Sequence, residues 1–169
     1  MLTLQCIRSV MDLNQFQRIN VLSLPIYEAS RPPDSWPPRF FLHNHHHVIF
    51  AEYSAERKVV TLYDSLGRSG FLFYEPFYAN HIAIRHFFGT RVLQRSPRSR
   101  VCAYHAVIFS FGYFSPEPEY RIGRYFPSLL RRAQRIISER GKNFDAIASG
   151  LSTSKGLKIL PLGHLRGNR

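Results

Sequence analysis

Two apolar runs between residues 40 and 64 predict a pair of β-strands joined by a short turn. The first run covers residues 40–53 (F-F-L-H-N-H-H-H-V-I-F-A-E-Y), and the second covers residues 58–64 (K-V-V-T-L-Y-D). Both are rich in aromatic and β-branched residues, which favour strands, and the polar segment 54–57 between them suits a turn. We therefore expect an antiparallel hairpin.

The register of this hairpin decides which side chains meet. If the turn is centred between Ala55 and Glu56, residues whose numbers sum to 111 face each other, so His47 lies opposite Asp64. Facing side chains have Cβ atoms about 5 Å apart, a distance at which an imidazole can meet a carboxylate. A slip of one residue would pair Asp64 differently, so this contact depends on the turn.

Helix-like spacing of apolar residues occurs in three later segments. Pro76 can begin a helix that continues over residues 77–88, with Ile82, Phe87 and other apolar residues spaced along it. Residues 103–111 are apolar and predict a buried central helix. Residues 127–139 form the clearest amphipathic helix. Its apolar face holds Leu129, Leu130, Ala133, Ile136 and Ile137, and its arginines are largely exposed.

The remaining segments have weaker patterns. Residues 31–39 hold four prolines and the only tryptophan, which predicts an extended surface loop. Residues 21–26 suit a short strand or a buried extended segment. We find no repeat and no domain boundary, so we expect one domain over residues 1–169, with poorly defined ends at 1–30 and 160–169. The elements together predict an α+β fold in which a mixed or antiparallel sheet packs against the central helix.

Composition narrows the class of protein. The chain has 169 residues, of which 44% are hydrophobic, enough for one globular domain with a core. We expect no membrane span and no secretory signal, because the sequence has neither a long apolar run nor a basic segment before an apolar one. The two cysteines, Cys6 and Cys102, are too few for a disulfide framework and suggest a reducing compartment.

The formal net charge of the chain is +12. A basic protein of this size attracts polyanions, most often nucleic acid, and the alternatives are solubility or an acidic protein partner. The charge indicates an attraction and does not identify a function.

Cys102 lies where a polar, arginine-rich loop leads into the predicted central helix. Free N–H groups at a helix N-terminus and nearby arginines favour a thiolate. A lone cysteine before an apolar run is more often a small buried core residue. The surrounding residues must therefore decide between a reactive and a structural thiol.

Four residues supply what a cysteine protease needs, in the order His47, Asp64, Gln94 and Cys102. A thiolate attacks the carbonyl carbon, and an imidazole takes the thiol proton and later protonates the leaving amine. A carboxylate orients the imidazole. A side-chain amide and the backbone N–H of the cysteine can bind the developing oxyanion.

This order and spacing resemble the adenain clan, which contains adenovirus-type proteases and the SUMO and ubiquitin-like-protein proteases. The matching segments are H-V-I-F-A-E-Y at 47–53, V-T-L-Y-D-S-L at 60–66 and Q-R-S-P-R-S-R-V-C-A-Y-H at 94–105. The resemblance covers residues 40–112 and is weaker elsewhere. It implies a papain-like, adenain-like fold whose central helix carries the nucleophile, with His47, Asp64, Gln94 and Cys102 as the catalytic residues.

The resemblance also implies a function. We expect a thiol endopeptidase, a monomeric viral protein that processes capsid or core precursors during virion maturation, located in the virion and the host nucleus or cytoplasm. Small residues such as Gly-Gly are expected at the cleaved bond. The alternatives are a deubiquitinase or deSUMOylase, or an acyltransferase, of the same clan, and a non-enzymatic basic nucleic-acid-binding protein.

Some positions depart from the family pattern. Val48 stands where a tryptophan usually follows the histidine, and Ala103 stands where a glycine usually follows the cysteine. No cysteine lies between Asp64 and Cys102, so activation by a disulfide-linked peptide is not expected. The chemistry needs no cofactor, but a nucleic acid or peptide activator is compatible with the charge. Candidate DNA-binding arginines are Arg91, Arg95, Arg98, Arg100, Arg131, Arg132 and Arg135.

Other polar residues were weighed against these four. His43, His45, His46 and His47 resemble a metal site, but no cysteine or carboxylate cluster accompanies them, so we expect none. His105 lies about one helical turn after Cys102 and competes for the role of base, although a hydrogen-bonded core histidine is the simpler interpretation. Glu52 and Glu56 are poorer candidates than Asp64 for the orienting acid.

Overall fold

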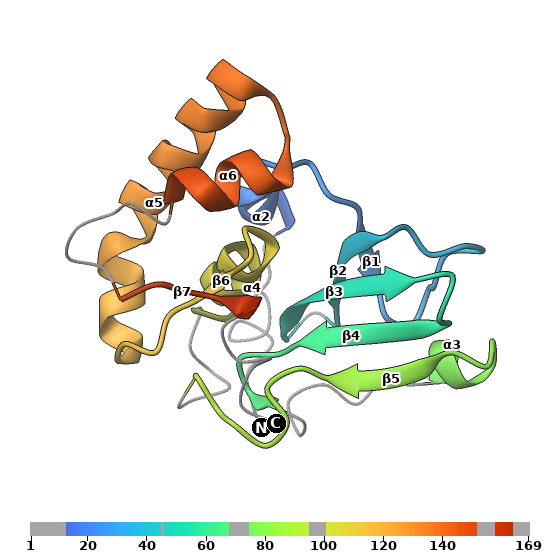
Figure 1. Ribbon diagram of the computed structural model, residues 1–169. Coiled ribbons are helices and arrows are strands. Elements are labelled where there is room, and N and C mark those ends of the chain that lie inside the picture. Colours follow the sequence, from blue (N-terminus) through green and yellow to red (C-terminus); the bar gives the residue numbers. More distant parts are fainter. Residues whose placement is uncertain (1–12, 45, 68–74, 95–100, 152–157, 164–169) are drawn as a thin grey trace.

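The computed structural model describes residues 13–44, 46–67, 75–94, 101–151 and 158–163, and it has an α+β fold (Figure 1). A five-stranded sheet has the order β1-β2-β3-β4-β5. The strands are β1 (Ile26–Glu28), β2 (Arg39–His43), β3 (Val48–Ser54), β4 (Val59–Tyr63) and β5 (Ala83–His86). The outer pairs are parallel and the inner pairs antiparallel, so the sheet is mixed.

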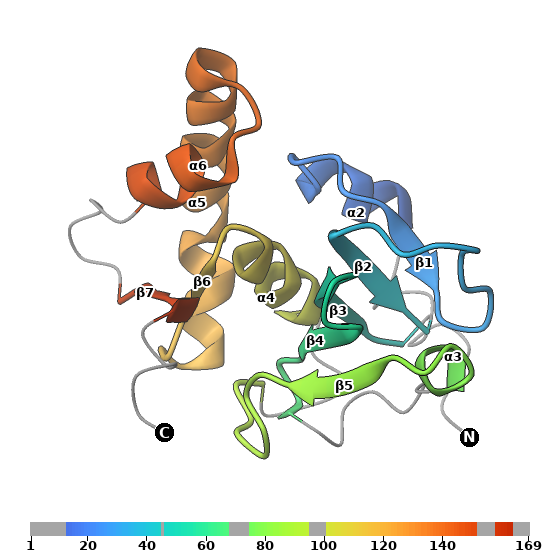
Figure 2. The same cartoon turned by 45° about the vertical axis from the view of Figure 1, so that its right-hand side comes forward.

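The helices gather mainly beyond one end of this sheet. They are α2 (Leu13–Ile19), α3 (Glu75–Tyr78), α4 (Val101–Ser110), α5 (Glu119–Arg140) and α6 (Phe144–Leu151). Both views place α4 between the sheet and the pair α5 and α6 (Figures 1 and 2). A second, two-stranded sheet pairs β6 (Tyr113–Phe114) with β7 (Leu160–Pro161).

The core lies on both faces of the large sheet. On one face, Phe41, Phe50 and Tyr63 pack with buried residues of α4. On the other face, Phe40 and Phe77 contact Trp36, with ring centroids 4.9 Å apart in each pair. The tryptophan of the proline-rich loop therefore anchors that loop to the sheet. Alternation of side chains along each strand explains why consecutive apolar residues serve both faces.

The strand predicted over residues 40–53 is wrong as a single element. The structure divides it into β2 and β3, which pair antiparallel. The turn between them begins at Asn44, whose Oδ1 accepts hydrogen bonds from the backbone N–H groups of His46 and His47, at 3.1 and 2.8 Å. An asparagine side chain that bonds the backbone in this way mimics a turn and stops a strand.

The hairpin of β3 and β4 is present, but its predicted register is wrong. Ser54 pairs with Val59 and Phe50 with Tyr63, so facing residues have numbers that sum to 113 instead of 111. The four-residue turn covers residues 55–58 instead of 54–57, and Lys58 in it has a positive φ of 50°. A shift by two residues keeps every side chain on its face of the sheet, since the period is two. Asp64 therefore stays on the face that His47 shares, as a diagonal neighbour instead of a direct one.

The predicted helix over residues 77–88 is also wrong. The helix α3 ends at Tyr78, and residues 83–86 form β5, which runs parallel to β4. Ile82 and Ile84 join one core cluster, whereas Phe87 belongs to the other. The spacing of these residues fits a period of two as well as a helix, and pairing with β4 selects the strand.

The central and amphipathic helices are present. The helix α4 covers the apolar segment predicted as the central helix. The helix α5 begins eight residues before Pro127 and carries this proline in its interior. The helix α6 was not predicted. Among the described residues, none of the helices combines the length and apolar content needed to cross a bilayer.

Candidate active site

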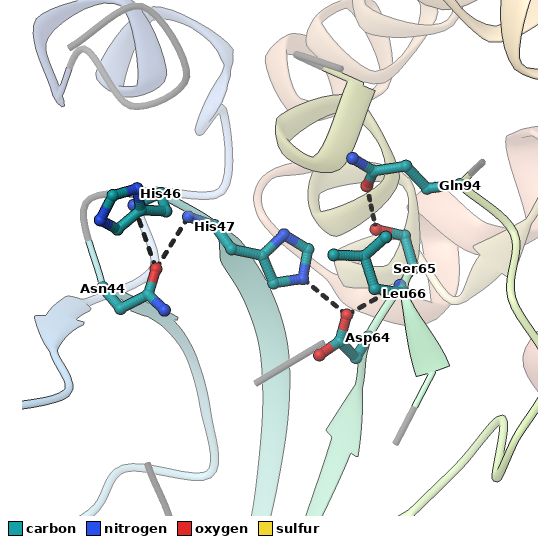
Figure 3. A network of polar contacts seen from close by, with 7 residues as sticks. All are labelled: Asn44, His46, His47, Asp64, Ser65, Leu66 and Gln94. Carbon is teal, nitrogen blue, oxygen red and sulfur yellow. Dashed lines mark hydrogen bonds and ion pairs between the residues drawn. The ribbon is translucent and has the colours of Figure 1, made fainter. Parts of the chain in front are cut away.

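His47 and Asp64 meet at the ends of β3 and β4. The Nε2 atom of His47 lies 2.6 Å from Oδ1 of Asp64, and both side chains are buried (Figure 3). The same Oδ1 accepts a hydrogen bond of 2.9 Å from the backbone N–H of Leu66. Because two donors converge on one oxygen, the carboxylate is fixed in position and in turn fixes the imidazole ring.

The electrostatics of the pair favour an imidazolium. Burial, the largest influence, lowers the pKa of His47. The hydrogen bond and charge of Asp64, together with the polar interaction with nearby Cys102, offset this effect and raise the pKa to about 9. The ring is therefore protonated at neutral pH, with its positive charge held between a carboxylate and a sulfur.

Cys102 is the second residue of α4, in the first helical turn. Its side chain is free of disulfides and only 1% exposed. The other ring nitrogen of His47, Nδ1, points away from Asp64 and has no hydrogen-bond partner within the described part of the chain (Figure 3). Cys102 is thus near enough to influence the imidazole without forming a hydrogen bond of normal geometry. Such bonds are often long in a resting enzyme.

Gln94 is the fourth predicted residue, and Ser65 holds it beside the acid. The backbone N–H groups of Leu93 and Gln94 both donate to the carbonyl oxygen of Ser65, at 2.8 and 2.9 Å. The Ser65 hydroxyl also donates to Oε1 of Gln94 at 2.7 Å, in a buried setting. The carbonyl end lies at Ser65, and the N–H₂ end lies away from it (Figure 3).

Sequence reasoning missed Ser65, although it directly follows the predicted acid. Its role depends on a contact between residues 29 positions apart, and no local pattern reveals such a contact. In the structure, His47 thus interacts electrostatically with both Asp64 and Cys102. Gln94 is hydrogen-bonded to Ser65, the residue after Asp64.

Comparisons with known proteins identify no relative. No family model matches the chain, and neither a curated protein nor a solved structure matches it significantly. Any statement about its chemistry therefore rests on the residues and their geometry.

His105 is buried on the same helix, one turn after Cys102, and does not fit the expectation of a hydrogen-bonded core histidine. Neither of its ring nitrogens has a hydrogen-bond partner in the described ranges of the chain, and its ring stacks on Phe109 with centroids 5.8 Å apart. Burial, followed by the charge of His47, lowers the pKa of His105 to about 4. A ring that stays neutral at physiological pH and has no hydrogen-bonded carboxylate among the described residues is a poorer base than His47.

The other candidates lie elsewhere. Glu52 accepts a hydrogen bond from the Tyr63 hydroxyl and pairs with Arg39, and Glu56 is exposed in the turn. In the part of the chain that the structure describes, no cluster of three or more His, Cys, Asp or Glu side chains could hold a metal ion. His45 and Cys6 lie outside the described residues, as do Arg95, Arg98 and Arg100.

Proposed function

We propose that this protein is a cysteine endopeptidase of the adenain type, with a papain-like fold, that cleaves viral capsid or core precursors. The observation that carries the proposal is the 2.6 Å bond between His47 and Asp64, with Cys102 coupled to the same imidazole from a helix N-terminus. A carboxylate, an imidazole and a thiol in this order form the arrangement that activates a sulfur nucleophile.

The proposed reaction has two steps. The Cys102 thiolate attacks the carbonyl carbon of the scissile bond, and the imidazolium of His47 gives its proton to the departing amine, which leaves a thioester. Water then attacks the thioester, with His47 as general base, and releases the acid and the thiol. Asp64 keeps its charge throughout and stabilises the imidazolium. Because Cys102 is buried, the side chains that cover the sulfur must move when a substrate binds.

In this proposal, Gln94 stabilises the oxyanion together with the backbone N–H of Cys102. The first N–H groups of a helix have no intrahelical acceptor, so the amide of Cys102 is available. A carboxamide donor aimed at the same oxygen adds to that stabilisation. Ser65 then acts as a positioning residue, because its hydroxyl occupies the carbonyl end of Gln94.

Replacing Ser65 by Ala should lower kcat by about tenfold, with little change in KM, because a misplaced oxyanion donor is less costly than the roughly 10²–10³-fold loss of removing one. Steady-state hydrolysis of a Gly-Gly aminomethylcoumarin peptide measures both constants. Ser110→Ala is the matched control, since it also removes a buried hydroxyl, one that donates to the Val107 carbonyl. Equal kcat in the two variants, or a change confined to KM, would show that Ser65 does not position Gln94.

The choice between an endopeptidase and an isopeptidase of the same clan concerns the substrate and leaves the chemistry unchanged. Vinyl sulfone probes built on a Gly-Gly peptide, on ubiquitin and on SUMO separate the two. We expect the peptide probe to add its mass to the tryptic peptide that contains Cys102. Labelling by the ubiquitin or SUMO probe alone would assign the isopeptidase function, and labelling of Cys102 by none of them would reject a thiol protease.

Nucleic acid remains a proposed activator or partner, and its attachment would be electrostatic. The helix α5 exposes several arginines: Arg121, Arg124, Arg131, Arg135 and Arg140. Arg132 is half-buried and donates to the Gly150 carbonyl at 3.3 Å. A row of cations of this kind favours a phosphate backbone without reading its sequence. The site of action remains, as a proposal, the virion and the host cell.

A further inference from the structure

Beyond the end of the sheet that α4 covers, one face of the sheet carries a polar row. Arg39 pairs with Glu52, Glu52 with Thr61, and Thr61 with Arg85, across β2, β3, β4 and β5. Paired residues point to the same face. The next row on that face is apolar and packs with α4, because Phe41, Phe50, Tyr63 and Phe87 belong to its core cluster. The polar row therefore lies just beyond the part of the sheet on which α4 packs.

A groove with a volume of about 510 Å³ lies over this row. Its lining includes three arginines, Arg39, Arg57 and Arg85, and one acid, Glu52. Volumes in this range are typical of sites that hold a ligand. Glu52 lies five residues from His47, about 17 Å along an extended strand, so the groove is separate from the thiol site.

The charged side chains in the groove differ in whether they are already paired with another side chain. Glu52 is already engaged, because Arg39 lies 3.6 Å away and the Tyr63 hydroxyl donates to it. The Arg39 guanidinium also lies 4.0 Å from the centre of the Phe144 ring. By contrast, Nε of Arg85 is buried and has no hydrogen-bond partner among the residues that the structure describes. Among the described residues, no carboxylate pairs with Arg85 or Arg57.

A buried guanidinium nitrogen without an acceptor is costly unless a ligand supplies one. Arginine matches a carboxylate in particular, because its planar fork can donate two parallel hydrogen bonds. The row from Arg39 to Arg85 spans three strand spacings, about 14 Å, which is long enough for about four residues of an extended peptide. The Glu52 carboxylate in the lining would repel a continuous phosphate backbone but leaves room for separated acidic side chains.

We propose that this groove binds an extended acidic peptide segment of a protein partner, with its carboxylates on Arg85 and Arg57. The inference stands on the sheet face and its charges, so it does not depend on the chemistry of Cys102. Arg39 and Glu52 pair with each other and line one side of the groove. The carboxylate of the partner accepts the hydrogen bond that Arg85 can donate.

The test is binding of a fluorescein-labelled peptide, Gly-Glu-Gly-Glu-Gly-Glu-Gly, measured by fluorescence anisotropy at physiological salt. Arg85→Gln should weaken binding by about tenfold, the loss of a charge-assisted hydrogen bond. Arg57→Gln changes an exposed side chain and should weaken binding about threefold, a typical value for a surface ion pair. Arg18→Gln, an exposed change on α2, removes the same charge elsewhere and should leave the affinity within about twofold.

Three results would overturn the proposal. One is equal binding of a peptide with Gln in place of each Glu, and another is equal weakening by Arg18→Gln, which would show attraction to net charge alone. The third is a short single-stranded oligonucleotide whose affinity falls in Arg85→Gln while the peptide is unaffected, which would assign the groove to nucleic acid. Amide chemical shifts in a ¹H–¹⁵N spectrum localise the peptide, and Thr61 and Arg85 should move most.

Discussion

Replacing Cys102 by Ala is expected to reduce kcat/KM for a Gly-Gly peptide substrate by about 10⁴-fold or more, down to the rate that oxyanion binding alone supplies. The substitution removes the atom that forms the thioester, so no other group on this helix can replace it.

This variant should remain folded, because it removes one sulfur atom from a buried site and keeps the Cβ. A loss of about 1 kcal/mol is expected, and thermal unfolding measures it. Cys6→Ala is the control, since it removes the only other thiol of the chain. Activity that survives in Cys102→Ala, or that disappears in Cys6→Ala, would contradict the assignment of the nucleophile.

Asp64→Asn is expected to have the second largest effect, a fall in kcat/KM of about 10³- to 10⁴-fold. An amide has nearly the shape of the carboxylate, but it carries no charge and can present N–H₂ to the ring. The imidazole then loses the partner that holds it 2.6 Å away and stabilises its charged form. Asp145→Asn, an exposed change on α6, should leave the activity unchanged.

The pH profile of kcat/KM for Asp64→Asn should show in which direction Asp64 shifts the pKa of His47. Burial lowers the pKa of His47, and Asp64 and Cys102 raise it to about 9. Activity that requires the imidazolium should therefore persist up to about pH 9 and fall above it. Without the charge of Asp64, the alkaline limb of the kcat/KM profile should move to lower pH. A profile that moves upward or stays in place would show that Asp64 does not stabilise the ring.

The free energy of unfolding should also depend on pH, because the pKa of His47 differs between the folded and the unfolded protein. The pKa of His47 in the folded protein lies above the ordinary 6.5, so its contribution is fully present below pH 6.5 and is lost as the pH rises through about 9. Asp64→Asn removes much of that contribution. The difference in unfolding free energy between the two proteins should therefore shrink toward alkaline pH.

The sequence predicted the contact between His47 and Asp64 although the register was wrong. The pairing of the two strands is shifted by two residues from the expected register, but an even shift preserves the face of each side chain, so both side chains stayed on one side of the sheet. A shift of one would have separated them. The prediction was correct about the face of the sheet on which the two side chains lie, because the alternation of residues along a strand sets that face. It was wrong about the direct pairing of the two residues across the strands, because the position of the turn sets that pairing.

Other features depended on contacts that no local pattern reveals. Asn44 ends β2 because its side chain bonds the backbone of His46 and His47, whereas the surrounding residues read as one strand. Residues 83–86 became β5 because β4 offered an edge to pair with. Ser65 belongs to the site only through its hydrogen bond to Gln94. The groove over β2–β5 is formed by a row of residues from four different strands.

The alkylation rate of Cys102 by iodoacetamide, compared between the folded protein and His47→Gln at neutral pH, tests the central claim most directly. Tryptic mass spectrometry separates this thiol from Cys6, and no substrate has to be known. If the imidazolium activates the sulfur, His47→Gln should slow the modification by about tenfold or more, the effect of losing a charge partner. The difference should vanish in denaturant. Equal rates in the two folded proteins, or no modification of Cys102 in either, would mean that the sulfur is a core side chain.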